Sequence, residues 1–316
     1  MRRRLSPVQQ DTAPVVFEGD TVMTAQPAPR TTVSVLGLGH LGQALADAFL
    51  AQGHPTTVWN RSPHKADGAV ARGAFRAASA ADAIAASELV VVTVLDYDTV
   101  GELLRPAAGS LAGRTLVNLT TGTPGAAREL GAWVTDQRAA YVDGAVYAVP
   151  QTIGTADSFV LYSGDEAAYK QHRPVLDLLG EGVFVGTAPD LSSVYDTALL
   201  SGMYGMFSGF FQAVALAGTE GIGAAAVTSQ LVRWLTAVAG ALPAFAEEID
   251  RGDFDTTTSN VEINAVGLRN ILTTTEAQGV STDLLAPLQR LFEDQMDAGH
   301  AASSLSRTIE SLRAGR

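Results

Sequence analysis

The order of apolar and polar positions divides the chain into two unlike halves. Up to about residue 190, short apolar runs alternate with longer amphipathic stretches, which is the pattern of strands alternating with helices. From residue 191 onward only helical periodicity remains. The pattern predicts an α/β fold class, with a doubly wound parallel sheet followed by an all-α C-terminal domain.

The apolar runs and the glycines between them set the expected elements. We expect a first domain over 31–190, a helical domain over 191–316, and a disordered extension over 1–30, where no apolar run is long enough for a secretory signal. The predicted strands are 33–36, 56–59, 88–95, 115–119, 140–146, 159–162 and 183–185. The predicted helices of the second half are 193–219, 224–250, 257–278, 284–298 and 301–314, separated by Gly221, Gly252, Gly279 and Gly299.

The uncharged run from Thr197 to Thr219 is long enough to cross a membrane. Its borders are the acids Asp196 and Glu220, and no nearby Lys or Arg sets an orientation. The run also contains Ser201, several glycines and other polar positions, and no second span accompanies it. We therefore expect a buried central helix that links the two domains, and no membrane span.

Composition narrows the classes of partner. A net charge of −12 over 316 residues disfavours nucleic acid and anionic lipid surfaces. With 47% hydrophobic and 17% charged residues the chain can bury a large core. The absence of cysteine removes thiolate catalysis and cysteine metal sites and is compatible with a cytoplasmic setting. We predict no metal site.

A glycine-rich turn between the first strand and the first helix carries the clearest chemistry. Gly37, Gly39 and Gly42 form GxGxxG after a strand and at the start of a helix. The glycines permit a tight turn and a close approach of pyrophosphate, and the helix N-terminus offers free N–H groups. The alternative is a glycine-rich turn without a ligand. We predict a Rossmann dinucleotide site with Gly37, Leu38, Gly39, His40, Leu41 and Gly42 as cofactor-binding residues.

The loop after the second strand indicates which dinucleotide binds. An NAD enzyme places an acid here on the ribose diol, whereas this chain has Asn60, Arg61, Ser62 and Lys65. The two cations would attract a 2′-phosphate, although they could also be ordinary solvated charges. We predict NADPH as the cofactor.

The ends of two later strands should lie beside the nicotinamide half, because ligands bind at the carboxyl edge of a parallel sheet. The residues at these ends are Val94, Leu95, Asp96, Thr120 and Thr121. For the Asp96 side chain we favour a helix cap. Thr123 followed by Pro124 predicts the start of another helix.

One face of the long helix carries a lone carboxylate among apolar residues. Asp196 and Tyr204 lie two turns apart, roughly 12 Å along the axis, so one small substrate could touch both. A buried carboxylate is costly unless it is paired or used, and we favour catalysis over a structural role at the helix start. The apolar residues of this face, which could also be plain core, are the predicted substrate pocket: Leu200, Met203, Phe207 and Phe211.

With these motifs the chain resembles the NADPH-dependent imine reductases and reductive aminases, a branch of the β-hydroxyacid dehydrogenase superfamily. The resemblance covers residues 32–313 and rests on GLGHLGQA (37–44), NRS (60–62), NLTTGTP (118–124), DGAVYAVPQTIG (143–154), VLYSG (160–164) and YDTALLSGMYGMFSGF (195–210). It implies reduction of C=N bonds by hydride transfer, and a C-terminal domain like that of 6-phosphogluconate dehydrogenase.

The departures from the parent superfamily agree with this chemistry. Its carbonyl-reducing members keep a lysine at the position of Asp196 and an asparagine at Leu200, and a glycine-rich SGG stands where this chain has Tyr147-Ala148-Val149. A carboxylate favours the protonated, cationic imine. Family members with Asp here are often R-selective. Reductive aminases commonly have Asn at the position of Thr121, so we expect preformed cyclic imines to be the better substrates.

The resemblance also implies a domain-swapped homodimer, in which Trp234 reaches the other subunit's pocket. Trp234 could equally be simple core. Two alternative functions remain: a carbonyl-reducing β-hydroxyacid dehydrogenase, and a non-catalytic NADP(H)-binding sensor.

Overall fold

The computed structural model describes residues 30–313, so the predicted extension lies outside the described residues except for Arg30, whose guanidinium donates to the carbonyl of Gln52. The chain divides into two compact units, Met1–Ser192 and Ser193–Arg316, and each is described by itself.

The first unit is built on one eight-stranded sheet with the order β3-β2-β1-β4-β5-β6-β7-β8. The order reverses at β1, which makes the carboxyl edge between β1 and β4 a switch point where ligands bind. The strands are β1 (Val33–Leu36), β2 (Thr56–Trp59), β3 (Phe75–Arg76), β4 (Leu89–Val92), β5 (Thr115–Asn118), β6 (Ala140–Tyr147), β7 (Phe159–Gly164) and β8 (Glu181–Gly186).

The predicted strands are all present, and one strand pair departs from the parallel arrangement. Strands β1 to β6 pair in parallel, whereas β7 is antiparallel to β6 and then parallel to β8. The connection from β6 to β7 contains only the 3₁₀ turn η3 (Pro150–Thr152), and without a crossover helix the chain returns in the opposite direction. The two-residue strand β3 was too short to be predicted.

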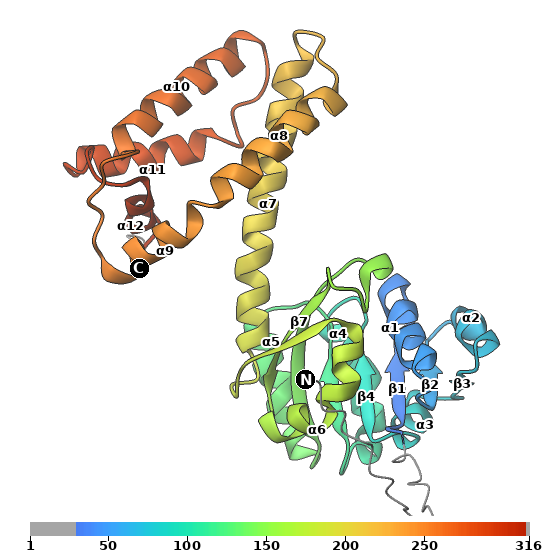
Figure 1. Cartoon of the computed structure of the whole chain (residues 1–316). Helices are drawn as coiled ribbons and strands as arrows, with labels where there is room; N and C mark the ends of the chain where they lie inside the picture. Colours follow the sequence, from blue (N-terminus) through green and yellow to red (C-terminus); the bar gives the residue numbers. More distant parts are fainter. Residues whose placement is uncertain (1–29, 314–316) are drawn as a thin grey trace, which may run out of the picture. The chain divides into compact units, whose positions relative to one another are not determined.

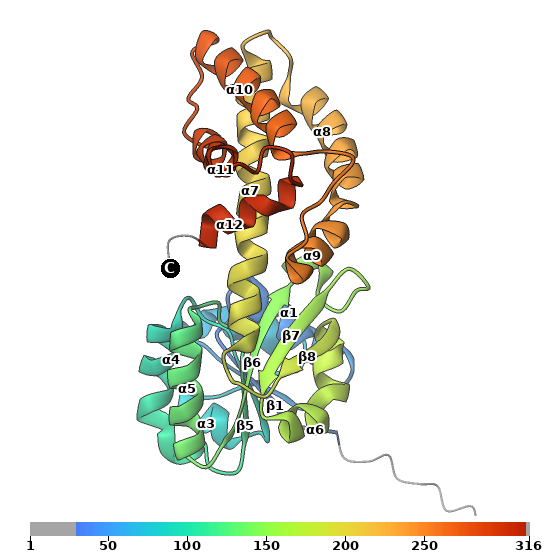
Figure 2. The same cartoon turned by 90° about the vertical axis from the view of Figure 1, so that its left-hand side faces the viewer.

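Helices cover both faces of the sheet. Apolar side chains of α1, α2 and α6 pack on one face with Val35, Val91 and Val160, and those of α3, α4 and α5 pack on the other with Val90, Val92 and Leu116. Figure 2 shows α3, α4 and α5 together on one side of the strands. This is the predicted doubly wound architecture. The helices are α1 (His40–Ala51), α2 (Asp67–Ala71), α3 (Ala80–Ala85), α4 (Tyr97–Leu104), α5 (Pro124–Asp136) and α6 (Glu166–Leu176), with the 3₁₀ turns η1 (Pro63–Ala66), η2 (Arg105–Ser110) and η4 (Asp177–Leu179).

The described part of the second unit is helical, as predicted (Figure 1). The expected helix over 224–250 is interrupted: Gly240 ends one helix and Pro243 lies in the first turn of the next, where its missing N–H costs nothing. The elements are α7 (Leu191–Gly218), α8 (Ala224–Ala239), α9 (Leu242–Arg251), α10 (Val261–Ala277), α11 (Ala286–Asp297), α12 (Thr308–Arg313) and the 3₁₀ turn η5 (Leu305–Arg307).

The long helix α7 differs from expectation in its burial. Among the described residues it is the one helix long and apolar enough to cross a membrane, yet only 6% of its most apolar 18-residue stretch is buried in this chain. The small core of the second unit is made by α10 and α11 around Val261, Ala265 and Phe292, and it does not include α7. The prediction of a buried helix is therefore wrong for the single chain.

Candidate functional site

The glycine-rich turn between β1 and α1 has the geometry of a phosphate-binding turn. Gly37 has φ of +98°, and a Cβ there would lie 2.0 Å from the carbonyl oxygen of Thr93, so a side chain is excluded by both strain and space. Gly39 forms the N-cap of α1 without a side-chain cap, and a Cβ on it would meet nothing within 4 Å. The first residues of α1, whose N–H groups have no partner within the helix, line the cavity at the positive end of the helix dipole.

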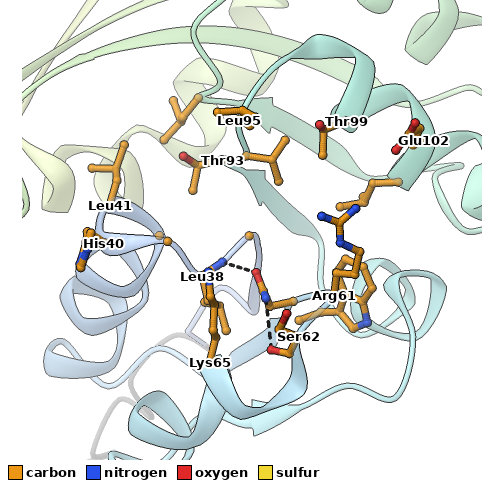
Figure 3. Close-up of a pocket in the computed structure, with 18 of the residues that line it drawn as sticks. Leu38, His40, Leu41, Arg61, Ser62, Lys65, Thr93, Leu95, Thr99 and Glu102 are labelled. Carbon is orange, nitrogen blue, oxygen red and sulfur yellow. Dashed lines mark hydrogen bonds between the residues drawn. The ribbon is translucent and has the colours of Figure 1, made fainter.

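This turn forms part of a cavity of about 730 Å³ along the carboxyl edge of the sheet (Figure 3). A cavity of this size suits an extended small molecule. Its walls come from the glycine-rich turn, the loop after β2, the end of β4, the first two turns of α4 and the end of β5. The lining residues are Gly37, Leu38, Gly39, His40, Leu41, Gly42, Trp59, Asn60, Arg61, Ser62, Lys65, Thr93, Val94, Leu95, Thr99, Glu102, Leu103, Leu119 and Thr121.

Asn60, a predicted cofactor-binding residue, makes two hydrogen bonds within the protein. Its Oδ1 accepts a hydrogen bond from the backbone N–H of Leu38 at 2.9 Å, and its Nδ2 donates to the carbonyl of Ser62 at 3.2 Å (dashed lines in Figure 3). The side chain thus joins the glycine-rich turn to the loop after β2. Asn60 borders the cavity, but its polar atoms hold the two loops together.

The cationic side of the cavity comes from the loop after β2. Arg61 and Lys65 both line the cavity, and no acid stands at the end of β2. Figure 3 shows Arg61 reaching into the space, with Thr99 and Glu102 on the α4 side. Sequence reasoning missed these two residues and Leu103. Their spacing of three and four places them on one face of α4, and that face could have been identified once Asp96 was taken as the cap.

Of the five residues predicted at the ends of β4 and β5, three line the cavity and two do not. Val94, Leu95 and Thr121 are lining residues. Thr120 is buried, and its hydroxyl accepts a hydrogen bond from the N–H of Val94 at 3.1 Å.

Asp96 caps α4, as favoured. Its Oδ1 accepts from the N–H of Thr99 at 2.8 Å and from the Thr99 hydroxyl at 2.7 Å. These hydrogen bonds hold the pKa of Asp96 below its usual value. Thr123 caps α5 with Pro124 at the first position, also as predicted.

The predicted catalytic residues lie on α7. Asp196, one turn into the helix, is 6% exposed, which is unusual for a carboxylate. Tyr204 is 63% exposed and its ring meets that of Phe207 edge to face. Leu200 and Met203 are half-buried, whereas Phe207 and Phe211 are exposed.

Trp234 lies on α8, apart from the α7 residues in sequence. It is 65% exposed and borders an open groove with Ile222, Ala226, Val227, Gln230 and Leu231. The alternative of a simple core role for Trp234 is wrong for the single chain. Within residues 30–313, no group of three or more His, Asp or Glu residues could hold a metal ion.

A doubly wound sheet with a glycine-rich turn at its switch point, a cavity along that edge and a basic loop after β2 defines a dinucleotide-binding protein. Family models match both parts of the chain. The NAD binding domain of 6-phosphogluconate dehydrogenase matches residues 32–186, and the C-terminal domain of NADPH-dependent reductive aminase-like proteins matches residues 188–314.

Individual proteins extend the match over nearly the whole chain. The NADPH-dependent reductive aminase of Aspergillus oryzae is 38% identical over 288 residues, which span 90% of this chain and 98% of the relative. The reductive aminase from Aspergillus terreus, solved in complex with NADPH and ethyl-5-oxohexanoate, has a TM-score of 0.86 at 40% identity and covers 90% of this chain and 99% of its own. The imine reductase from Myxococcus stipitatus, solved with NADP⁺, has a TM-score of 0.85 at 33% identity, with 89% and 99% covered.

The chain therefore belongs to the family of NADPH-dependent reductive aminases and imine reductases. The family, the enzyme class, the fold class and the cofactor predicted from the sequence are confirmed.

Proposed function

We propose that this protein reduces C=N bonds of small imines with NADPH, and that Asp196 is the residue that selects a cationic imine over a carbonyl. The observation that carries the proposal is a buried carboxylate in the first turns of α7, where carbonyl-reducing relatives keep a lysine. Bound NADPH would supply the hydride. The residues of the chain would bind and orient the cofactor and the imine and provide a charge opposite to that of the iminium ion.

The cofactor end of the proposal rests on the cavity of the first unit. The free N–H groups at the start of α1 suit the pyrophosphate, and Arg61 and Lys65 suit a 2′-phosphate. Leu95 and Thr121 border the cavity at the ends of β4 and β5, the position expected for the nicotinamide ring. Leu95 is 86% exposed, so its apolar side chain is accessible for contact with a flat ring.

Asp196 would act through its charge. A carboxylate next to an imine raises the proton affinity of the nitrogen, and the iminium ion so formed accepts hydride more readily than the neutral imine. In a site shielded from water this attraction is stronger than in solution. The same attraction orients the carbon toward the hydride donor. Tyr204 and the apolar residues Leu200, Met203, Phe207 and Phe211 of the same helix are proposed to shape the substrate pocket.

The proposed substrate class is the cyclic imine. Thr121 stands where reductive aminases commonly have Asn, so this chain lacks one amide that could assist the condensation of a ketone with an amine. A preformed ring imine needs no such step. The A. terreus reductive aminase has been solved with cyclohexanone and allyl amine. The coupling of such a ketone with an amine is the reaction to compare with ring-imine reduction in this chain.

We further propose a cytoplasmic, domain-swapped homodimer in which a second copy covers α7 and α8. Large apolar side chains are exposed along both helices in the single chain, among them Leu199, Met206, Phe211, Val232 and Trp234. Exposed apolar patches of this extent mark an interaction surface. A second copy suits it because a homodimer interface is rich in apolar area and the flanks of α7 are acidic, unlike those of a membrane helix.

The test follows NADPH absorbance with 1-pyrroline or 2-methyl-1-pyrroline against a β-keto or semialdehyde acid, for the wild type and for Asp196→Ala and Asp196→Asn. The wild type should turn over the imines. Both variants should lose at least about 100-fold in kcat, since each removes the charge, while the Kd of NADPH changes less than about twofold. Turnover of the acid alone would support a carbonyl reductase, and NADPH binding without any turnover would support a sensor. Variants with wild-type rates would refute the role of Asp196.

A further inference from the structure

A second buried carboxylate lies in the first unit, and the proposed reaction does not use it. Asp143, on β6, is 2% exposed. Its Oδ1 accepts hydrogen bonds from the hydroxyls of Tyr97 and Tyr141, each at 2.7 Å, and from Nδ2 of Asn118 at 3.2 Å. Its Oδ2 accepts from the Ser192 hydroxyl at 2.7 Å. One carboxylate thus joins the first residue of α4, the last residue of β5, the second residue of β6 and the first turn of α7.

The donors around Asp143 match an ionised carboxylate. An ionised carboxylate accepts at both oxygens and has no proton to give, and these four partners all donate. Burial, followed by the charge of Asp143, raises the pKa of Tyr141 well above its usual value, so that hydroxyl stays protonated and continues to donate. Burying a charge with its partners is often no more stabilising than an apolar core of the same volume. The cluster is therefore better explained by the position it fixes than by stability.

Tyr97 connects this cluster to the cofactor cavity. It lies two residues after Leu95, which borders the cavity and is labelled in Figure 3. Its ring lies against the backbone of Gly122: a Cβ there would be 2.2 Å from a ring carbon of Tyr97. Gly122 follows Thr121, the other proposed nicotinamide neighbour. The ring thus holds the two loops at a fixed separation, and its hydroxyl is held by Asp143.

A second connection reaches the same loops through Asn118. Its Oδ1 accepts the N–H of Thr120 at 3.3 Å, and the Thr120 hydroxyl accepts the N–H of Val94 at 3.1 Å. Asn118 also donates to Asp143. Two sets of contacts, one through Tyr97 and one through Asn118, therefore connect Asp143 to the loops after β4 and β5.

We propose that Asp143 is a positioning residue, which sets the nicotinamide end of the cavity by holding Tyr97 and Asn118. The inference rests on the proposed function in one respect, namely that the nicotinamide ring lies between Leu95 and Thr121. The adenosine end, at Arg61 and Lys65, is bordered by other loops and is independent of the cluster.

This difference between the two ends gives the test. Tyr97→Phe keeps the ring against Gly122 and removes only the hydroxyl. NADPH reaches both ends of the cavity, whereas adenosine 2′,5′-bisphosphate reaches only the adenosine end. By calorimetric titration, Tyr97→Phe should weaken NADPH up to about tenfold, because loops no longer held by this intraprotein hydrogen bond must be ordered when NADPH binds, at a cost of the order of one hydrogen bond. The variant should leave the affinity for the bisphosphate within about twofold. Asp143→Asn, which replaces one of the two acceptor oxygens with an NH₂ donor among groups that all donate, should produce the same selective loss.

Tyr169→Phe is the matched control. This tyrosine is also buried in the first unit, but its hydroxyl donates to the carbonyl of Gly182, in β8. It should change neither affinity. Equal weakening of both ligands by Tyr97→Phe, or no weakening of NADPH, would overturn the positioning role. A wild type that binds the bisphosphate as tightly as NADPH would overturn the proposed nicotinamide site itself and the inference with it.

Discussion

We propose that Arg61 and Lys65, which line the cavity with no acid beside them at the end of β2, select NADPH over NADH. A carboxylate at the end of β2 would bind the ribose diol of NAD and repel a 2′-phosphate. Here that end is Asn60, whose amide is committed to Leu38 and Ser62. We propose that the two cations meet the phosphate, together with Ser62, which also lines the cavity. Both were found in the sequence, whereas the scaffolding role of Asn60 required the loop geometry.

Arg61→Ala removes one of these cations. We expect the KM for NADPH to rise about tenfold, as for the loss of one charge-assisted hydrogen bond, with kcat for 1-pyrroline little changed. The KM for NADH should change by less than about twofold, since NADH has no 2′-phosphate. Arg72→Ala is the control, because Arg72 is paired with Asp47 and does not line the cavity. Equal increases in the KM for NADPH and for NADH would show that Arg61 contributes to the binding of both cofactors and does not recognise the 2′-phosphate.

At the scale of elements, the sequence predicts what local periodicity determines and fails where distant contacts decide. The strands β1, β2 and β5 and the glycine turn agree with prediction nearly to the residue because their apolar runs are bounded by clear turn signals. The antiparallel step from β6 to β7 could not be predicted, since pairing direction depends on the path of the connection. Asp143 was recognised only as part of a motif. Its four donors come from positions up to 49 residues away.

The packing of α6 on the sheet supplies a prediction about pH. His172 of α6 is buried, with its Nε2 3.1 Å from the hydroxyl of Thr115 on β5. Burial lowers the pKa of His172, an effect that the charge of Glu88 partly offsets. The folded protein therefore resists a proton that the unfolded chain accepts near its ordinary pKa of about 6.5. Stability should fall as the pH decreases below about 6.5.

Replacing this histidine should remove that contribution. In urea unfolding at pH 7.5 and pH 5, His172→Gln should lose less free energy of unfolding between the two pH values than the wild type does. A lower stability of the variant at pH 7.5 does not affect this comparison, because the test is the difference between the two pH values. Identical differences for both proteins would show that His172 does not contribute to the pH dependence.

At the scale of the whole molecule, the two units differ in how completely one chain buries its apolar side chains. The first unit has apolar cores on both faces of its sheet. The second has one small core between α10 and α11, while large apolar side chains stay exposed on α7, α8 and α9. The sequence pattern correctly identified α7 as a long apolar helix and wrongly predicted that this chain buries it. Periodicity does not reveal which surface covers an apolar helix, so the exposure of α7 in the single chain could not be predicted.

If a second copy supplies that surface, a charge placed on it should separate the copies. Val232 on α8 is 58% exposed in the single chain, and burying such a side chain contributes about 1.5–3 kcal/mol. Val232→Glu removes this favourable burial and places a charge in the interface, so the Kd of the dimer should rise at least about 100-fold. The measurement is sedimentation equilibrium, with the wild type at twice the mass of the chain and the variant shifting to monomer on dilution. Phe75→Glu, at an exposed apolar position of the first unit, should leave the mass unchanged. A wild type that sediments as a monomer would contradict the proposed dimer directly, because α7 and α8 would then remain uncovered in solution.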